Sequence, residues 1–408
     1  MRVQVSEKPG SQSKSENNMD SNARVQNGGR LEWPLNRSVT LNMFYHGDLS
    51  DAHHGQSIYL NNLISDLEKY SDVTVKCFAK TPTPHLRKAG LETVWGTLFE
   101  MIIVLRSIVS DSKSIDSHRS NRINLTADAY GSLFPILHSW IRRIPLVYVA
   151  SDTFSSYTKS LRSSKYRGAI LISVFRWLIE PLLLGFSKLI LVRSDAMKNE
   201  LAILGIRESK IITLNHAMIP PPRNEPKIHE FMAQFKLQRG KTIVFIGNCR
   251  YPPNLKAAKY IISTLSKQMA IYSPDLKILL VGRGTDEFNS LPENVIALGE
   301  VEDIHTVIYS SDIGICPTDV TGGTSAKTMD YLSHGLIAIV TPEVCRSIPF
   351  NADLFACELN NFMEAIIKAL RILQVERNPL RNSNTLREIE REKSNSINEL
   401  IKRLRQLT

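Results

Sequence analysis

DIGICPTDVTGGTSAKTMDYLSHGLIAIVT, residues 312–341, is the stretch that decides the fold of this chain. Its apolar segment at 313–316 is typical of a strand that ends at a proline, and a polar turn then leads to Gly322 and Gly323. A helix that starts near Thr324 leaves its first backbone N–H groups without partners above the edge of a sheet. Such groups favour an anion, so the stretch predicts an anion-binding turn between a strand and a helix.

Lys327 and Asp330 lie three residues apart on the expected helix and therefore share one of its faces. The lysine offers an ammonium group to a phosphate, and the aspartate offers a carboxylate that accepts hydrogen bonds from sugar hydroxyls. Together they favour a nucleotide-sugar as the ligand. The alternative is a surface acid that pairs with Lys327, an ion pair worth less than about 1 kcal/mol.

The composition is that of a globular protein with more than one domain. At roughly 150 residues a domain, 408 residues fit two or three domains, and a hydrophobic content of 43% is enough for their cores. The cysteines are scattered and never form a CxxC pair, which favours the reducing cytosol over a disulfide framework or a zinc site. They are Cys77, Cys249, Cys316, Cys345 and Cys357.

The N-terminal segment, residues 1–37, is rich in Ser, Asn, Gly and charge and lacks the apolar core of a signal peptide. We expect a disordered tail there. The sequons at Asn36 and Asn124 carry no glycan in a cytosolic protein, because such a protein does not meet the glycosylation machinery.

The formal net charge of +10 is compatible with nucleic acid, an anionic membrane lipid or a phosphorylated substrate as partner. The basic residues are spread along the chain, without an Arg-rich tract, a zinc-finger spacing or an aromatic RNA-binding signature. We therefore expect no nucleic-acid partner. A solvated basic surface is the simplest interpretation of the charge.

Short apolar runs alternate with helical patterns from residue 38 to about 375, which is typical of βα units and parallel sheets. The first half, residues 38–216, is predicted to be one doubly wound, Rossmann-like α/β domain with helices that include 57–69 and 195–204. Its expected strands are 40–45, 73–78, 123–126, 146–150, 189–192 and 211–214.

Four prolines between residues 217 and 226 indicate that this span holds neither helix nor strand, and a linker is placed at 217–240. The alternation restarts in residues 241–376 and predicts a second Rossmann-like domain. Residues 377–408 are predicted to form a charged helix that packs on another part of the protein. In the second domain the expected strands are 242–246, 277–281, 295–298, 313–316 and 337–340, and the expected helices are 254–270, 303–310, 324–334 and 361–372.

Two apolar stretches raise the question of a membrane. Residues 168–192 are interrupted by charged side chains and Pro181, and residues 94–109 carry charges as well, so neither is expected to span a bilayer. A partly buried helix that leads into a strand is one interpretation of residues 168–192. The other is that an arginine, Trp177 and apolar residues rest on an anionic leaflet.

Four segments of the second half carry a specific resemblance to a known family. FIGNCRYPPNLKAAKYI (245–261), LLVGRGTDEF (279–288), LGEVEDI (298–304) and the opening stretch resemble, in order, the motifs of the retaining glycosyltransferases of the GT-B fold, family-4 type. The likeness is weaker in the first half, and overall it covers residues 40 to about 375. It implies two Rossmann-like domains facing each other across a cleft, the first for the acceptor and the second for a nucleotide-sugar donor.

This family transfers a sugar from a nucleoside-diphosphate donor, so its members must stabilise the charge of the leaving diphosphate. By resemblance, Arg250 and Lys327 neutralise that charge and act in catalysis, while the backbone amides of Gly323 and Thr324 contribute. Lys256 has the spacing of a second phosphate-binding cation, with an exposed helical lysine as the alternative.

Gly247 and Gly282 lie in turns that resemble the family's donor-binding glycine turns. Asp330 matches the second acid of the family's paired-acid motif, which implies a contact with the ribose. The first acid should lie eight residues earlier, where this chain has Gly322. The group that contacts the donor sugar in this family is therefore missing here, or it is supplied by Asp319 or by a backbone amide, and the identity of the sugar stays open.

The loop after the first strand of the first domain carries Gly55, which the resemblance places under the diphosphate. Two adjacent histidines, His53 and His54, suggest a metal, but no partner recurs at ligand spacing, and no metal site is expected. Asp152 follows a strand and would be the polar group nearest the reaction centre, in catalysis, with a helix N-cap as the alternative.

The remaining patterns exclude other chemistries. No Asp-x-Asp follows a strand, and GxSxG, the Walker lysine motif and a complete dinucleotide fingerprint are missing. We expect a metal-independent glycosyltransferase of the hexosyltransferase class, without cofactor, that acts in polysaccharide or glycoconjugate synthesis on a glycan or lipid-linked acceptor. It would be cytoplasmic, with peripheral association to the inner face of the plasma membrane as an option. A sugar-nucleotide epimerase and an inactive nucleotide-sugar-binding scaffold are the alternatives.

Overall fold

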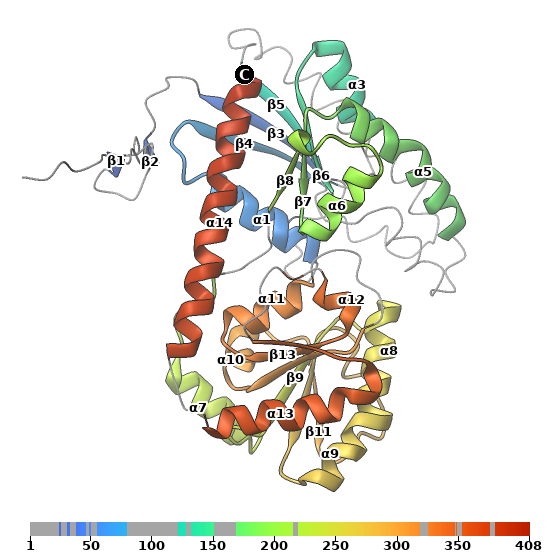
Figure 1. Ribbon diagram of the computed structural model, residues 1–408, viewed down its shortest axis with the longest axis vertical. Helices are drawn as coiled ribbons and strands as arrows, with labels where there is room; N and C mark the ends of the chain where they lie inside the picture. Colours follow the sequence, from blue (N-terminus) through green and yellow to red (C-terminus); the bar gives the residue numbers. More distant parts are fainter. Residues whose placement is uncertain are drawn as a thin grey trace, which may run out of the picture.

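The computed structural model describes residues 24–25, 31–32, 38–45, 49, 55–79, 121–127, 132–150, 169–214, 219–318, 325–346, 348, 353–375 and 380–408. They form two α/β domains, one above the other in Figure 1, each built on a six-stranded sheet. Every strand pair within these two sheets is parallel. The expected fold class, two doubly wound Rossmann-like domains, is confirmed.

The first domain has the strand order β4-β3-β5-β6-β7-β8. All six expected strands are confirmed, because each carries apolar residues that are buried in the core of the domain. The strands are β3 (Val39–Tyr45), β4 (Val73–Ala79), β5 (Arg122–Ala127), β6 (Leu146–Ala150), β7 (Leu189–Val192) and β8 (Ile211–Thr213). The helices are α1 (Gly55–Leu67), α3 (Leu133–Arg142), α5 (Ala169–Phe186) and α6 (Asp195–Ile203), with a 3₁₀ turn at Glu208–Lys210.

The second domain has the order β11-β10-β9-β12-β13-β14, so the strand order reverses between β9 and β12. In open α/β sheets, ligands bind beyond the carboxyl ends of the strands at this reversal. The strands are β9 (Thr242–Ile246), β10 (Lys277–Val281), β11 (Val295–Gly299), β12 (Ile313–Cys316), β13 (Ile337–Val340) and β14 (Leu354–Ala356). The helices are α8 (Pro252–Tyr260), α9 (Ser266–Tyr272), α10 (Ile304–Tyr309), α11 (Ala326–Ser333), α12 (Pro342–Cys345) and α13 (Phe362–Val375), with a π-helical turn at Ile261–Leu265 and a 3₁₀ turn at Leu359–Asn361.

The expectation that the proline-rich segment holds no helix was wrong beyond Asn224. Helix α7 (Glu225–Gln234) begins there, because the Asn224 side chain accepts a hydrogen bond from the backbone N–H of Lys227. Pro226 lies in the first turn of α7, where backbone N–H groups have no partner within the helix. The N–H that proline lacks therefore costs the helix no hydrogen bond. Ile228 and Met232 of α7 are buried in the core of the second domain.

Within residues 1–37, expected to be a disordered tail, two short strands pair antiparallel: β1 (Arg24–Val25) and β2 (Leu31–Glu32). For residues 1–37 as a whole, a disordered tail stays a prediction. In this pair Val25 is opposite Leu31, and Arg24 is opposite Glu32.

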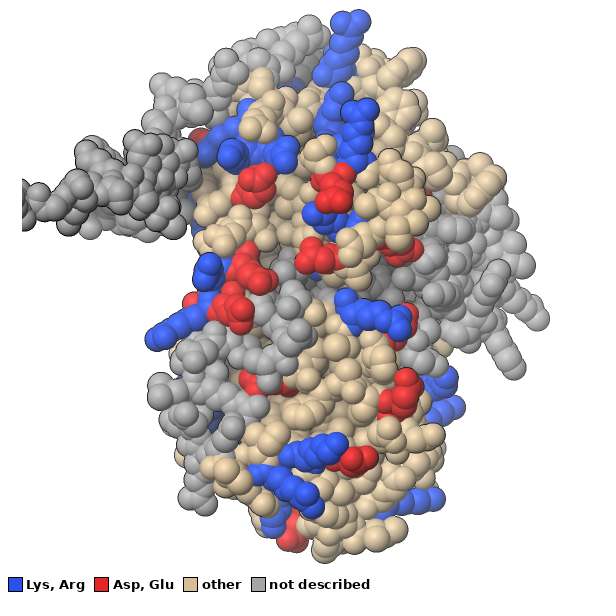
Figure 2. Space-filling model, in the orientation of Figure 1, with Lys and Arg blue, Asp and Glu red and all other residues tan. Residues whose placement is uncertain are grey.

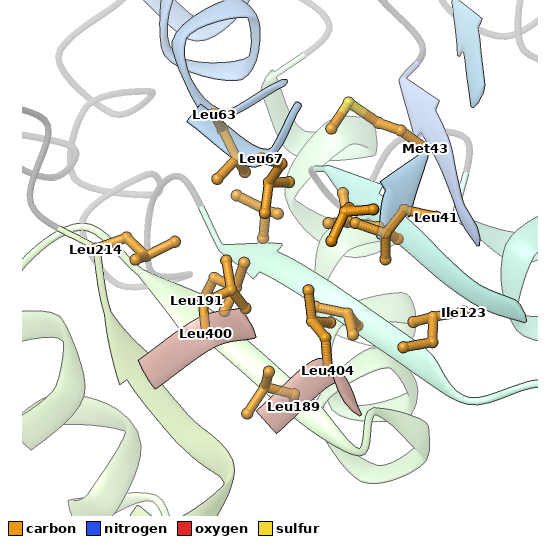
Figure 3. Close-up of a cluster of buried hydrophobic side chains, with 14 of the residues drawn as sticks. Leu41, Met43, Leu63, Leu67, Ile123, Leu189, Leu191, Leu214, Leu400 and Leu404 are labelled. Atoms are coloured by element: carbon orange, nitrogen blue, oxygen red, sulfur yellow. The ribbon is translucent and has the colours of Figure 1, made fainter. Parts of the chain in front are cut away.

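Helix α14 (Leu380–Leu407) runs along one side of both domains (Figure 1). Ile389 is buried in the core of the second domain, whereas Leu400 and Leu404 are buried in the core of the first. Figure 3 shows these two leucines beside Leu189 and Leu191 of β7. The expectation that the C-terminal helix packs on another part of the protein is confirmed, and the helix contributes to both cores.

Polar contacts fix the position of α14 on the first domain. Arg405 donates two hydrogen bonds to the Asp72 carboxylate, both at 2.9 Å, and the Tyr70 hydroxyl donates to Asn398 at 2.6 Å. Bidentate pairs between arginine and a carboxylate restrict orientation as well as distance. The register of α14 against the first domain is therefore well defined.

Gly314→Ala is expected to destabilise the second domain by at least about 3 kcal/mol, because overpacking of a core forces backbone shifts. A Cβ on Gly314 in β12 would lie 2.2 Å from ring atoms of Tyr331, a fully buried side chain of α11. Urea unfolding of the full chain measures the loss. Gly185→Ala on α5 is the control, since a Cβ there meets nothing within 4 Å. Equal stability of both variants would contradict this account of Gly314.

Candidate functional site

The candidate site lies where β9, β10 and β12 end and α11 begins. Gly247 and Gly282 bring the ends of β9 and β10 together: a Cβ on Gly282 would lie 2.6 Å from the Gly247 carbonyl oxygen. Gly282 also has a φ of +119°, which side chains other than glycine rarely adopt. The close approach of two backbones accounts for Gly282, whereas a Cβ on Gly247 would lie 3.0 Å from side-chain atoms of Asn254 and Phe245. The contact of either glycine with a donor stays a prediction.

Lys327, in the first turn of α11, directs its ammonium group back over the end of β9. Nζ donates a hydrogen bond to Asn254 Oδ1 at 2.7 Å and lies 4.7 Å from the centre of the Phe245 ring. Burial is the main cause that lowers the pKa of Lys327. An anion would favour the charged ammonium and relieve the cost of its burial.

The thiol of Cys249 stays protonated beside this ammonium, because burial raises its pKa to about 11. Among the described residues, the side chains that contact Lys327 are an amide and an aromatic ring, both without charge. A lysine with no acidic side chain bound to it has its charge available for a ligand.

Asp330 lies one turn further along α11, and its Oδ1 atom is buried without a hydrogen-bond partner in the described part of the protein. Burial raises the pKa of this carboxyl group to about 7. A buried oxygen without a partner costs free energy unless a ligand supplies a donor. The alternative of an ion pair with Lys327 does not describe this arrangement, because the ammonium donates to Asn254 instead.

Two groups that sequence reasoning missed hold α11 in place. The Tyr331 hydroxyl accepts a hydrogen bond from the backbone N–H of Ile246 at 2.8 Å, which ties α11 to the end of β9. His334 Nδ1 is 2.6 Å from the Asp330 carbonyl oxygen, and its ring stacks on that of His305. Burial lowers the pKa of His334 to about 4, so a neutral imidazole donates this bond at neutral pH.

Asn254 was also missed, although it contacts both Lys327 and the turn after β9. Its Nδ2 donates to the backbone oxygen of Asn248 at 3.1 Å, while its Oδ1 accepts from the ammonium. The available signal was an amide side chain in the first turn of the helix that follows the glycine turn. Asn254 therefore orients the lysine relative to the end of β9.

The other two predicted cations lie at the surface. Arg250 has a side chain that is 66% exposed and pairs with Glu287 at 3.3 Å, an acid that sequence reasoning did not identify. Lys256 is exposed on α8. Exposed pairs of this kind are weak, so Arg250 can exchange Glu287 for a phosphate at little cost.

Several predicted site residues lie outside the described residues: Asp152, Asp319, Gly322, Gly323, Thr324, His53 and His54. Gly55 is the first residue of α1. In the described ranges, no group of three or more His, Cys, Asp or Glu side chains is placed to hold a metal ion. On the face shown in Figure 2, basic and acidic side chains lie interspersed over both domains, rather than in the continuous basic patch typical of nucleic-acid binding.

Residues 240–373 match the family model described as glycosyl transferases group 1, which confirms the resemblance noted in the sequence. Alr3699/HepE from Anabaena, solved in complex with UDP, aligns with a TM-score of 0.62 at 13% identity over 90% of this chain and 100% of that one. A glycosyltransferase from Rickettsia africae gives a TM-score of 0.58 at 12% identity, over 91% and 99% of the two chains.

A putative UDP-N-acetylglucosamine 2-epimerase from Listeria monocytogenes also aligns, with a TM-score of 0.53 at 12% identity over 86% of this chain and 90% of that one. No curated protein matches the chain. At such identities the solved structures establish the shared two-domain fold, and that fold is common to transferases and epimerases.

Proposed function

We propose, from the premise that residues 240–373 form a domain of the glycosyl transferases group 1, that this chain moves a hexose from a nucleoside-diphosphate sugar to a glycan, lipid-linked or other glycoconjugate acceptor. The observation that carries the proposal is the pair on α11. Lys327 presents a partly buried cation, and Asp330 presents a buried oxygen without a partner in the described part of the protein. A diphosphate beside a ribose offers the matching anion and hydroxyl donors.

The proposed mechanism stabilises the leaving group. As the bond to the anomeric carbon breaks, negative charge grows on the diphosphate, and a fixed cation in a site that excludes water stabilises that charge. Lys327 is held in place by Asn254 and Phe245 before any ligand arrives. Arg250 adds a second positive charge once it leaves Glu287. Asp152 is proposed as the polar group nearest the sugar, with retention of anomeric configuration.

A thermal-shift screen of the full chain against UDP-, GDP-, ADP-, dTDP- and CMP-sugars identifies the donor as the compound that raises the melting temperature. UDP-sugars come first, because solved proteins of the same fold carry UDP. A transferase releases nucleoside diphosphate only when an acceptor is present, beyond slow hydrolysis. An epimerase converts the sugar nucleotide without an acceptor, and a scaffold binds it without any turnover.

The reaction is expected to proceed without a divalent metal, because cationic side chains and helix N–H groups suffice to stabilise the leaving diphosphate. Turnover after treatment with EDTA is the measurement. Complete loss of activity that manganese restores would overturn this part of the proposal. We place the enzyme in the cytoplasm, at the inner face of the plasma membrane when its acceptor is lipid-linked.

A further inference from the structure

Helix α5 has an unusual distribution of side chains for a helix on a protein surface. Its outward positions carry Trp177, Leu178, Leu182 and Phe186, which are between 44% and 62% exposed. Its acid, Glu180, lies on the inward face and is only 4% exposed. A surface helix normally places its charges outward, so the outward face of α5 is suited to an apolar environment.

Helix α3 continues this surface. It contacts α5, and its outward positions hold Leu137, Trp140 and Ile141, which are at least half exposed and spaced as one helical face. We call the combined surface the α3–α5 face. Its residues are Leu137, Trp140, Ile141, Trp177, Leu178, Leu182 and Phe186. Soluble proteins commonly expose single, scattered apolar residues. Seven large ones on two contacting helices instead form a contiguous apolar patch, which marks an interaction site.

Basic residues gather at one end of the α3–α5 face. Helix α3 leads into β6 and α5 leads into β7, and these two strands are parallel neighbours. Both helices therefore end at the same edge of the sheet, where the Lys188 backbone N–H donates a hydrogen bond to the Leu146 carbonyl oxygen at 2.8 Å. Arg142 and Arg143 at the end of α3 and Lys188 at the end of α5 are exposed. Residues 132–150 contain no acid, and Glu180 is the one acid in residues 169–188.

We propose that the α3–α5 face docks this protein on the surface of an anionic lipid bilayer. Tryptophan is enriched at the interface between lipid and water, where its ring contacts acyl chains and its N–H stays hydrated. The three cations at the rim match anionic headgroups. In the described part of the chain no helix is long and apolar enough to cross a bilayer, so contact along the surface is the mode that fits.

This inference deepens the proposed function, because it rests on an acceptor that is carried by a membrane. The docking face and the Lys327–Asp330 pair are separate, since the face belongs to α3 and α5 of the first domain and the pair to α11 of the second. Vesicle binding and nucleotide binding can therefore fail independently. A chain that binds vesicles but no nucleotide would refute the transferase and keep the docking face.

Sedimentation of the full chain with vesicles tests the proposal. We expect binding to vesicles of phosphatidylcholine with phosphatidylglycerol, and much weaker binding to phosphatidylcholine alone. The variant R142Q/R143N/K188Q is expected to bind the anionic vesicles about 100-fold less tightly, at roughly fivefold for each cation. Asparagine replaces Arg143 because this position has a φ of 55°, which asparagine tolerates. Added salt is expected to weaken wild-type binding as well.

The aromatic part of the face is tested by W140S/W177S, which is expected to bind anionic vesicles at least tenfold less tightly. The matched control is Ile271→Ser, an 88% exposed apolar residue on α9 of the second domain, which is expected to change nothing. Thermal unfolding without ligand shows whether each variant still folds. Unchanged vesicle binding in both α3–α5 variants would overturn the proposal. So would a dimer that these variants dissociate, with no vesicle binding by the wild type.

Discussion

Lys327→Met is expected to remove most of the affinity for a nucleoside diphosphate. Leaving one partner of a buried, hydrogen-bonded charge pair alone costs about 2–5 kcal/mol, and the diphosphate would be that partner here. The apo protein should lose little stability, because burial already disfavours the Lys327 ammonium, whose hydrogen bond is to an amide rather than to an acid. Calorimetry with UDP and urea unfolding without ligand measure the two effects.

The matched control for this variant is Lys256→Met, which removes an exposed lysine from α8 of the same domain. We expect it to change UDP affinity by less than about 1 kcal/mol, as for a surface charge. If Lys256→Met abolished binding and Lys327→Met did not, the phosphate would lie beside α8. The proposal for the α11 pair would then be refuted.

Asp330→Asn is expected to stabilise the apo protein while it weakens nucleotide binding. Burial raises the pKa of the folded carboxyl group from its ordinary value of 3.8 to about 7. At a pH between these two pKa values, the carboxyl group therefore takes up a proton when the chain folds. The resulting contribution to stability is present in full below the unfolded pKa and is lost as pH rises through about 7. Asparagine has no such loss, so above pH 7 the variant should be more stable than the wild type by about 2–4 kcal/mol.

Nucleotide binding should show the opposite preference. An ionised carboxylate accepts hydrogen bonds from ribose hydroxyls better than a neutral acid does, so wild-type affinity is expected to fall as pH drops below about 7. Asp330→Asn should lose this pH dependence and bind UDP more weakly, by about 1.5–3 kcal/mol above pH 7. Asp275→Asn, in an exposed pair with Lys241, is the control and should keep the wild-type profile. A variant that is less stable than wild type at pH 8 would contradict this account of Asp330.

Hydrophobic patterns were sufficient to predict every strand of the two six-stranded sheets except β14. Helix α3 was missed, since its outward apolar residues Trp140 and Ile141 hide the contrast between a polar and an apolar face. Strand β14 was missed because its three residues are too few to show a period. Both failures are local, and neither affected the order of the domains.

The candidate site was predicted in part. Lys327 and Asp330 were identified from their spacing, but the chain alone could not show that Asn254, some seventy positions away, would hold the lysine. The same holds for Tyr331, whose hydroxyl is tied to Ile246 on another strand. Contacts between residues remote in sequence depend on the packed fold, whereas a pattern of three or four residues reports only on one element.

The path of α14 has a consequence for synthesis on the ribosome. Domains generally fold as units, and the first to emerge folds first. Here the core of the first domain contains Leu400 and Leu404, which are translated after the whole second domain. The first domain therefore cannot complete its core until the C-terminal helix has been translated. Leu189 and Leu191 stay uncovered until α14 emerges. Such a chain is expected to need a chaperone during translation more than a protein whose halves mature one after the other.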